Sequence, residues 1–102
     1  MRLPNRTVEG RQFSTSIIDA VWEKAWPVTG YDPNLWRRDK CGALIRKFYF
    51  GDIESQFGWE IDHVKPVSEG GSDALINLEP LQWENNRHKG DNWPSWECKI
   101  KG

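Results

Sequence analysis

The apolar positions in the first quarter of the chain repeat with the period of an α-helix. The residues concerned are Ile17, Ile18, Val21, Trp22 and Ala25. Steps of three and four residues place them on one helix face. Ser16 and Asp19 resemble a capping box near the start of this segment, and Pro27 ends it. We therefore expect an amphipathic scaffold helix from about Ser14, preceded by an irregular arm at residues 1–13, where no period is found.

Further along, the pattern changes to short segments typical of β-strands. Residues 44–50 are rich in aromatic and branched side chains and lie between two glycines. Residues 59–64 and 78–81 also predict strands, and a loop rich in Gly and Ser separates them. Residues 83–89 predict a short helix with basic residues at its C-terminal end and Gly90 as its stop. The last four elements are thus strand, loop, strand and helix.

Length and composition limit the classes of protein that fit. A chain of 102 residues forms one domain, so we predict a single α+β domain over residues 14–102. Its two cysteines, Cys41 and Cys98, are too few for a disulfide framework and are interpreted as thiols. No N-terminal segment has the pattern of a secretion signal, and no apolar run approaches the roughly 20 residues of a membrane span. We expect a cytoplasmic protein with no membrane association.

Charge is distributed unevenly along the chain. Residues 51–84 carry eight acids and one base, a net charge of −7, whereas the remainder carries +6. This segregation suits a cation-binding centre flanked by cationic side chains that bind the phosphates of a nucleic acid. The candidates for phosphate contact are Arg37, Arg38, Lys40, Arg46, Lys47, Arg87, His88 and Lys89. The alternative interpretation is that these are ordinary solvated charges.

The candidate chemistry is concentrated at Asp62 and His63. Phosphodiester hydrolysis needs an activated water and a positive charge at phosphorus. A neutral imidazole such as that of His63 is suited to accept a proton at pH 7, and the Asp62 carboxylate is a hard ligand that prefers Mg²⁺ or Mn²⁺. An isolated Asp-His pair is usually structural, so the pair alone does not decide the function.

The surrounding sequence does distinguish this pair. It reads Trp59-Glu-Ile-Asp-His-Val-Lys-Pro66, then Gly70-Gly71-Ser-Asp, Ile76-Asn-Leu78 and Leu81-Gln-Trp-Glu-Asn-Asn-Arg-His-Lys-Gly90. This segment resembles the ββα-metal core of HNH endonucleases, here at residues 57–90. The resemblance implies that His63 is the general base, that Asp62 and Asn86 bind one divalent ion, and that Asn77 ties down the loop and orients His63 through backbone hydrogen bonds.

Two further side chains near this core are candidates for metal contact. Glu60 lies on the same strand face as Asp62 and is assigned as a possible outer-sphere ligand. His88 stands two positions beyond the ligand expected from the resemblance, so contact with phosphate or solvent is favoured over contact with metal. One geometric condition also follows: adjacent strand residues point to opposite faces, so the strand must twist or end at Asp62 and His63.

The sequence departs from the family pattern in one respect. Many HNH proteins hold a structural zinc with two Cys-x-x-Cys pairs, and the corresponding positions here are Arg38, Cys41, Gln82 and Asn85. One thiol of four cannot form a tetrahedral sulfur site, so we expect no structural zinc. Packing by Phe48, Trp59 and Trp83 is expected to replace it. A makeshift site from Cys41, Cys98 and a histidine is the alternative.

These observations favour an endonuclease that cleaves DNA with one Mg²⁺ or Mn²⁺ ion. The main alternative is a non-catalytic DNA-binding or assembly module of the same fold, for instance in a phage packaging or defence complex. The presence together of Asp62, His63, Asn77 and Asn86 argues against it, because such a module has no need of all four. A purely structural domain would leave the polar helix at residues 83–89 unexplained.

Overall fold

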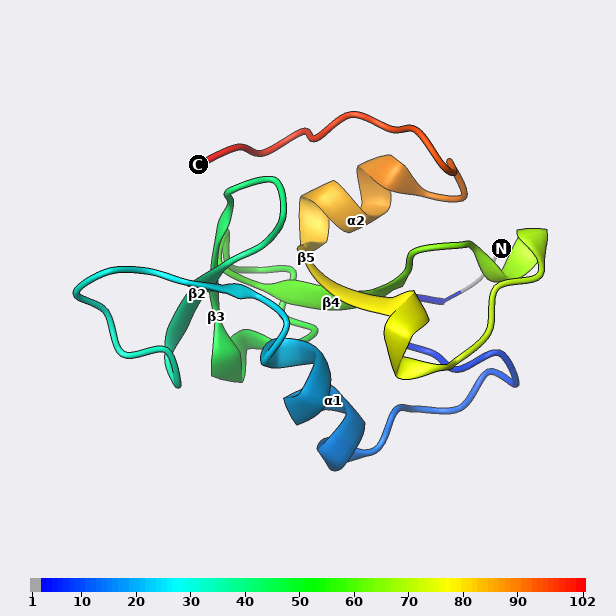
Figure 1. The fold of residues 1–102 in the computed structure, drawn as a ribbon, viewed down its shortest axis with the longest axis horizontal. Helices are drawn as coiled ribbons and strands as arrows, with labels where there is room; N and C mark the ends of the chain where they lie inside the picture. Colours follow the sequence, from blue (N-terminus) through cyan, green and yellow to red (C-terminus); the bar gives the residue numbers. More distant parts are fainter. Residues whose placement is uncertain (1–2) are drawn as a thin grey trace.

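A computed structural model describes residues 3–102, which form two small antiparallel sheets with a helix on either side (Figure 1). The elements in chain order are α1 (Thr15–Trp22), β1 (Trp26–Pro27), β2 (Trp36–Arg38), β3 (Leu44–Arg46), β4 (Trp59–His63), β5 (Leu78–Gln82) and α2 (Trp83–Lys89). Short 3-10 turns occupy Lys47–Tyr49, Val67–Glu69 and Leu75–Asn77. The predicted α+β class is confirmed.

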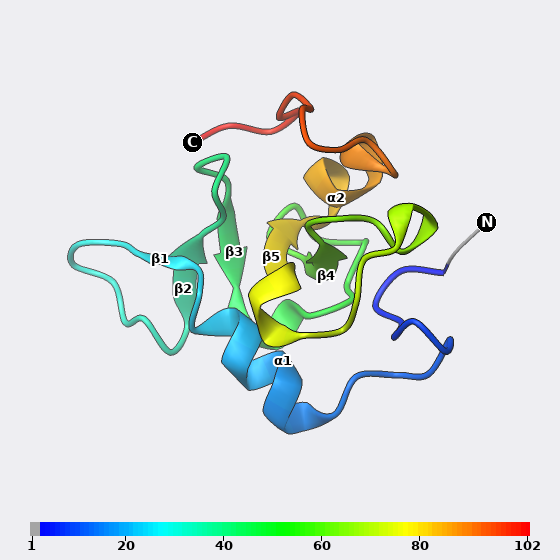
Figure 2. The same cartoon turned by 45° about the vertical axis from the view of Figure 1, so that its right-hand side comes forward.

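The predicted succession of strand, loop, strand and helix is present as β4, a loop, β5 and α2 (Figure 2). β4 and β5 pair antiparallel, with Asp62 opposite Glu79 and His63 opposite Leu78. The strand ends at His63, as the geometric condition on the Asp-His pair required. The second sheet has the order β1-β2-β3. Among residues 3–102, no helix is long and apolar enough to cross a membrane.

The first helix is shorter than its hydrophobic pattern suggested, and it is capped by a different residue. Ser14 is the N-cap, and its side chain accepts a hydrogen bond from the Ile17 backbone N–H. Because the capping-box partner lies three residues after the cap, Asp19 is too far along to serve. The expected box of Ser16 and Asp19 was therefore wrong. The helix ends at Trp22, and tighter turns follow, in which the Lys24 and Ala25 N–H groups donate to carbonyls three residues earlier.

The predicted strand at residues 44–50 is correct only in its first half. β3 ends at Arg46, and the next three residues turn as a 3-10 helix. The Lys47 backbone N–H donates to the Leu35 carbonyl, and the Lys47 carbonyl accepts from the Trp59 indole, so the turn has its own polar partners. The turn directs Phe48 outward, where it is 74% exposed. The expectation that Phe48 packs in the core was wrong.

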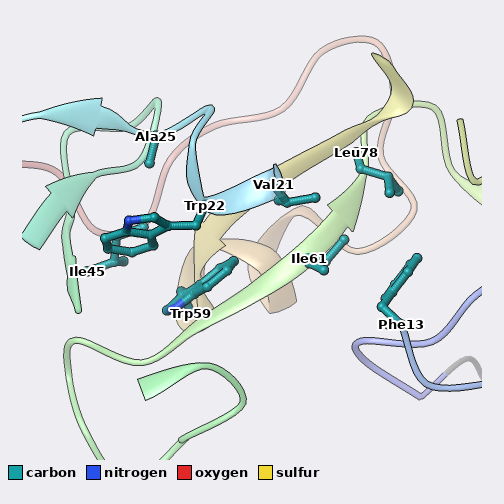
Figure 3. Close-up of a cluster of buried hydrophobic side chains, with 8 residues drawn as sticks. All are labelled: Phe13, Val21, Trp22, Ala25, Ile45, Trp59, Ile61 and Leu78. Atoms are coloured by element: carbon teal, nitrogen blue, oxygen red, sulfur yellow. The ribbon is translucent and has the colours of Figure 1, made fainter. Parts of the chain in front are cut away.

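The core lies between α1 and the two sheets, and two indoles dominate it (Figure 3). Trp22 and Trp59 are both fully buried, with ring centroids 5.4 Å apart. Each indole N–H donates to a backbone carbonyl, so neither polar atom is left without a partner. The predicted core role of Trp59 is confirmed. Trp83 is only half-buried, and its indole donates to the Ser55 carbonyl.

The C-terminal segment, residues 91–102, crosses over α2 and returns to the loop between β2 and β3 (Figure 1). There Cys98 forms a disulfide bond with Cys41, 57 residues earlier. The interpretation of both cysteines as thiols, and the alternative of a metal site that includes them, were therefore wrong. The disulfide uses Cys41, one of the four positions compared above with zinc ligands, and joins it to the C-terminal segment.

A buried hydrogen-bond network around Asp39 lies next to the disulfide. The Asp39 carboxylate accepts from the Gln82 backbone N–H at 2.9 Å and from Asn85 Nδ2 at 3.0 Å. Asn85 Oδ1 accepts from the backbone N–H groups of Lys99 and Ile100. Asp39 and Asn85 are fully buried, and Gln82 is nearly so. Asn85 therefore holds the C-terminal segment against α2, and Asp39 joins the loop between β2 and β3 to Gln82 and Asn85.

Candidate active site

A pocket of about 530 Å³ lies where β4 ends, beside the N-terminal part of the chain and the C-terminal part of α2. Asp62, His63 and Asn86 all line it. The three residues proposed to act on substrate or metal thus share one cavity although they are up to 24 positions apart. Arg6 and Arg87 line the same pocket, together with the acidic Asp62 and Asp91.

His63 is held at the pocket by contacts on both sides of its ring. Its side chain is only 7% exposed, and its Nε2 atom lies 2.9 Å from Asp73 Oδ1. The ring also faces Phe13, with centroids 6.0 Å apart. Phe13 restricts how far the imidazole can tilt, and Asp73 fixes one of its two nitrogens. These contacts fix the orientation of the His63 ring and leave its other nitrogen, Nδ1, unbound by Asp73.

Asp62 lies on the opposite side of the strand and points toward α2. Its Oδ1 atom accepts a hydrogen bond from Lys89 Nζ at 3.2 Å, and the same ammonium donates to the His63 carbonyl at 3.1 Å. Asp62 Oδ2 and Glu79 Oε2 are the two buried side-chain polar atoms within residues 3–102 that have no hydrogen-bond partner. Asp62 and Glu79 are opposed residues of β4 and β5, so these two oxygens belong to neighbouring carboxyl groups, of which only Asp62 lines the pocket.

Burial raises the pKa of Asp62 to about 9, since the charged carboxylate is removed from water. The neighbouring Glu79 carboxyl raises this pKa further, because a protonated Asp62 can donate a hydrogen bond to it, whereas the Lys89 ammonium lowers it. The balance favours a protonated Asp62 at neutral pH when no other cation is near. A second positive charge beside this carboxyl would favour its ionisation.

Asn86 is oriented by Glu60. Asn86 Nδ2 donates to Glu60 Oε1 at 2.8 Å, and Arg87 donates to the same carboxylate. A carboxylate accepts only, so the amide must turn its nitrogen toward Glu60 and its oxygen away. Within residues 3–102, Asn86 Oδ1 has no hydrogen-bond partner. Glu60, which is 1% exposed, thereby leaves an amide oxygen of α2 available.

Asn77 ties the loop between β4 and β5, as expected. Its Oδ1 accepts from the Lys65 backbone N–H at 2.9 Å, and its Nδ2 donates to the carbonyls of Lys65 and Ser72. The backbone of Gly71 passes so close to Lys65 that a Cβ atom there would lie 1.7 Å from the Lys65 carbonyl oxygen. Asn77 and Gly71 together give the loop its shape. Any effect of Asn77 on catalysis remains a prediction.

The residues expected to contact phosphate do not form one surface. Arg37 and Lys89 are buried, at 7% and 1% exposure, and are paired with Glu23 and Asp62. Neither side chain is available to a phosphate, so the expectation for these two was wrong. Both buried cationic groups have polar partners inside the protein: Arg37 donates to three backbone carbonyls and to the Glu23 carboxylate, and Lys89 donates to Asp62 and to the His63 carbonyl.

The other candidates for phosphate contact keep partly or fully exposed side chains. Lys40 pairs with Glu79, Arg38 donates to the Gly42 carbonyl, and Lys47 lies 3.9 Å from Asp19. Arg46 stacks on Trp36 at 4.8 Å. His88 is exposed on α2 and is not among the residues that line the pocket. Of the eight candidates, Arg87 alone lines it.

Sequence patterns assigned no role to two residues at this site, Arg6 and Asp73. Arg6 belongs to the arm at residues 1–13, which lacks any hydrophobic period. Asp73 follows a glycine-rich loop, where an acidic residue is ordinary. Their proximity to His63 depends on how the arm and the loop fold over the end of β4, and local patterns do not contain that information.

Comparison with known proteins places this site within a described family. Residues 50–92 match the family model described as HNH endonuclease. The matched segment contains β4, the loop tied by Asn77, β5 and α2. No curated protein and no solved structure shows a significant match to the chain.

Proposed function

Because residues 50–92 form a domain of the HNH endonuclease family, we propose that the protein is a metal-dependent endonuclease that hydrolyses phosphodiester bonds in DNA. The observation that carries this proposal is the shared pocket, whose lining includes a histidine and two side chains with oxygen atoms, Asp62 and Asn86, from different elements. His63 comes from the end of β4, and Asn86 comes from α2.

The residues present fit a divalent cation. Asp62 Oδ2 is a buried carboxylate oxygen without a partner, and Asn86 Oδ1 is left available by the hydrogen bond from its amide nitrogen to Glu60. Carboxylate and amide oxygens are the ligands that Mg²⁺ and Mn²⁺ prefer. We assign Asp62 and Asn86 as the ligands, with Glu60 in the outer sphere. When bound, the ion supplies a positive charge that stabilises the developing charge on the phosphate.

His63 is assigned as the general base. A ring nitrogen that accepts a proton from water would let that water attack phosphorus. Asp73 and Phe13 restrict the ring, so the imidazole does not need to be reoriented for each reaction. Asn77 supports this arrangement indirectly, because it holds the loop that carries Asp73. The proposed substrate is DNA, and Arg6 and Arg87 supply cationic side chains beside the pocket.

A second function, a non-catalytic DNA-binding or assembly module, is favoured by one observation. Lys89 already occupies one oxygen of Asp62, and burial keeps the pKa of this carboxyl high. If Lys89 replaced the metal permanently, the domain would keep its fold without activity. The two functions differ in whether DNA is cut when a divalent ion is added.

Supercoiled plasmid incubated with the purified protein separates the two functions. We expect nicked or linear DNA with Mg²⁺ or Mn²⁺ and unchanged plasmid with EDTA. His63→Ala should lose this activity, whereas His88→Ala, which removes the other histidine of the chain from an exposed position, should keep it. Binding of DNA without cleavage under any of these ions would favour the assembly module. The ratio of nicked to linear product would report whether one strand or both are cut.

A further inference from the structure

We propose that Asp73 is a positioning residue for His63, which it orients by accepting a hydrogen bond from Nε2–H. This inference rests on the proposed function for its catalytic consequence. The hydrogen bond itself joins two residues ten positions apart, at the end of β4 and in the loop before β5. The hydrogen bond gives the two ring nitrogens of His63 different roles, because Nε2 donates to Asp73 and only Nδ1 can accept a proton.

The chemistry of the pair determines which nitrogen carries the proton. A carboxylate has no proton to donate, so a hydrogen bond to Asp73 Oδ1 makes Nε2 the donor. A neutral imidazole carries one N–H, and the other nitrogen then has a free lone pair. With Nε2 protonated, Nδ1 becomes the atom of His63 that can accept a proton from water.

Nδ1 is the ring nitrogen that Asp73 leaves unoccupied. Within residues 3–102 this atom has no hydrogen-bond partner, and His63 lines the pocket. Because Nε2 is held by Asp73, Nδ1 is the nitrogen that remains to accept a proton from a water molecule in the pocket.

Asp73 is itself held by contacts from two parts of the chain. The backbone N–H of Val8 donates to both of its carboxylate oxygens, at 3.0 and 3.1 Å. On the other side, Asn77 Nδ2 holds the carbonyl of Ser72 at 2.8 Å, directly before Asp73. Through Val8, the N-terminal arm thus helps to hold Asp73 in place. Asn77 affects His63 through Asp73, and not only through the backbone of the loop.

A spectroscopic measurement tests the hydrogen bond without any cleavage. Imidazole ¹⁵N–¹H spectra of the protein, with the ring neutral and no divalent ion present, should show the His63 proton on Nε2 and slow exchange of this proton with water. Asp73→Ala and the isosteric Asp73→Asn should accelerate that exchange. Glu69→Ala, which removes an exposed acid from the same loop, should not. A proton found on Nδ1 in the unmodified protein would overturn the proposal.

Cleavage rates test the catalytic consequence. Loss of the carboxylate that orients a catalytic imidazole costs up to about 10⁴ in rate in serine proteases, so we expect Asp73→Ala to lower kcat by about 10- to 10³-fold with little change in KM for plasmid. The double variant His63→Ala/Asp73→Ala should be no slower than His63→Ala, because Asp73 acts through His63.

If Asp73 merely supported the loop, the comparison of the single and double variants would give a different result. Loss of Asp73 would slow the His63→Ala variant further, and that outcome would contradict a positioning role. An unchanged rate in Asp73→Ala would contradict it as well. If the unmodified protein cuts no DNA, the proposed nuclease function fails, and the ¹⁵N–¹H spectra alone decide whether Asp73 orients His63.

Discussion

Lys89 Nζ lies 3.2 Å from Asp62 Oδ1, and both side chains are almost completely buried, at 1% and 6% exposure. The lysine comes from the polar helix α2, where a basic residue near the C-terminus was expected to face phosphate. Instead, it donates to the Asp62 carboxyl at the base of the pocket and also to the His63 carbonyl. Lys89 thus joins α2 to the strand end that carries both proposed catalytic side chains.

Replacement of this lysine should destabilise the protein. Lys89→Met keeps most of the side-chain volume but removes the buried ammonium that donates to Asp62 and to the His63 carbonyl, and loss of a buried hydrogen-bond partner typically costs about 1 to 3 kcal/mol. Urea denaturation would measure the change in the free energy of unfolding. Lys101→Met, at an exposed position, is the control. A change in Lys89→Met no larger than in the control would show that the pair does not support the fold.

Asp62 should give the metal-free protein a characteristic dependence on pH. Its pKa is about 9 in the folded protein and 3.8 as the ordinary value, so between these limits the folded state holds one proton that the unfolded state has released. Stability from this group is therefore lost as pH rises through that range. Asp62→Asn, which cannot ionise, should become more stable relative to the unmodified protein as pH increases from about 5 to 8.

Thermal or urea denaturation in EDTA at several pH values would test this expectation. A difference between the two proteins that stays constant with pH would mean that Asp62 is already ionised in the fold. Mn²⁺ binding provides a second measurement, because the cation competes with the proton on Asp62. Its affinity should rise with pH over the same interval.

Removal of the proposed ligands should weaken binding of the divalent ion. Asp62→Ala and Asn86→Ala each delete an oxygen donor, and Glu60→Gln lets the Asn86 amide turn its nitrogen toward the pocket. Loss of such outer-sphere partners typically costs about 10- to 100-fold in metal affinity. Calorimetric titration with Mn²⁺ would quantify each change. A larger loss in His88→Ala than in Asn86→Ala would show that the ligand on α2 had been assigned wrongly.

His63→Ala should lower the rate of DNA cleavage by about 10² to 10⁴, the usual contribution of general acid-base catalysis. DNA binding should be retained, since the imidazole is 7% exposed and faces Asp73 and the pocket. Initial rates of plasmid nicking and a filter-binding assay would separate the two effects. Cleavage at the rate of the unmodified protein would exclude His63 as the base.

The disulfide should contribute a large part of the stability. It joins residues 57 positions apart, and closure of a loop of that length is worth about 4 kcal/mol in the chain-entropy description. Cys41→Ser/Cys98→Ser should therefore lower the melting temperature strongly, as should reduction by dithiothreitol. EDTA should leave it nearly unchanged, because both thiols that a structural zinc would need are already bonded to each other. Stoichiometric zinc in the purified protein, with unfolding on its removal, would contradict this assignment.

Local sequence patterns were sufficient for the elements that build the site. The short segments at residues 59–64 and 78–81, separated by a loop rich in Gly and Ser, predicted β4 and β5, and Gly90 marked the end of α2. The resemblance to HNH endonucleases placed Asp62, His63 and Asn86 together, and they do line one pocket. These features were predictable because strand boundaries, helix stops and motif spacing depend on neighbouring residues. The turn that follows Arg46 was not, since its residue composition suits a strand equally well.

Contacts between distant parts of the chain were decided by the tertiary structure. The bond between Cys41 and Cys98 depends on the C-terminal segment returning across α2, and the approach of Asp73 to His63 depends on the loop held by Asn77. The direction of Lys89 also followed from packing, because a basic residue at a helix end can face solvent or a buried carboxyl. Composition and spacing leave these outcomes open, since they specify which groups are present but not which are removed from water together.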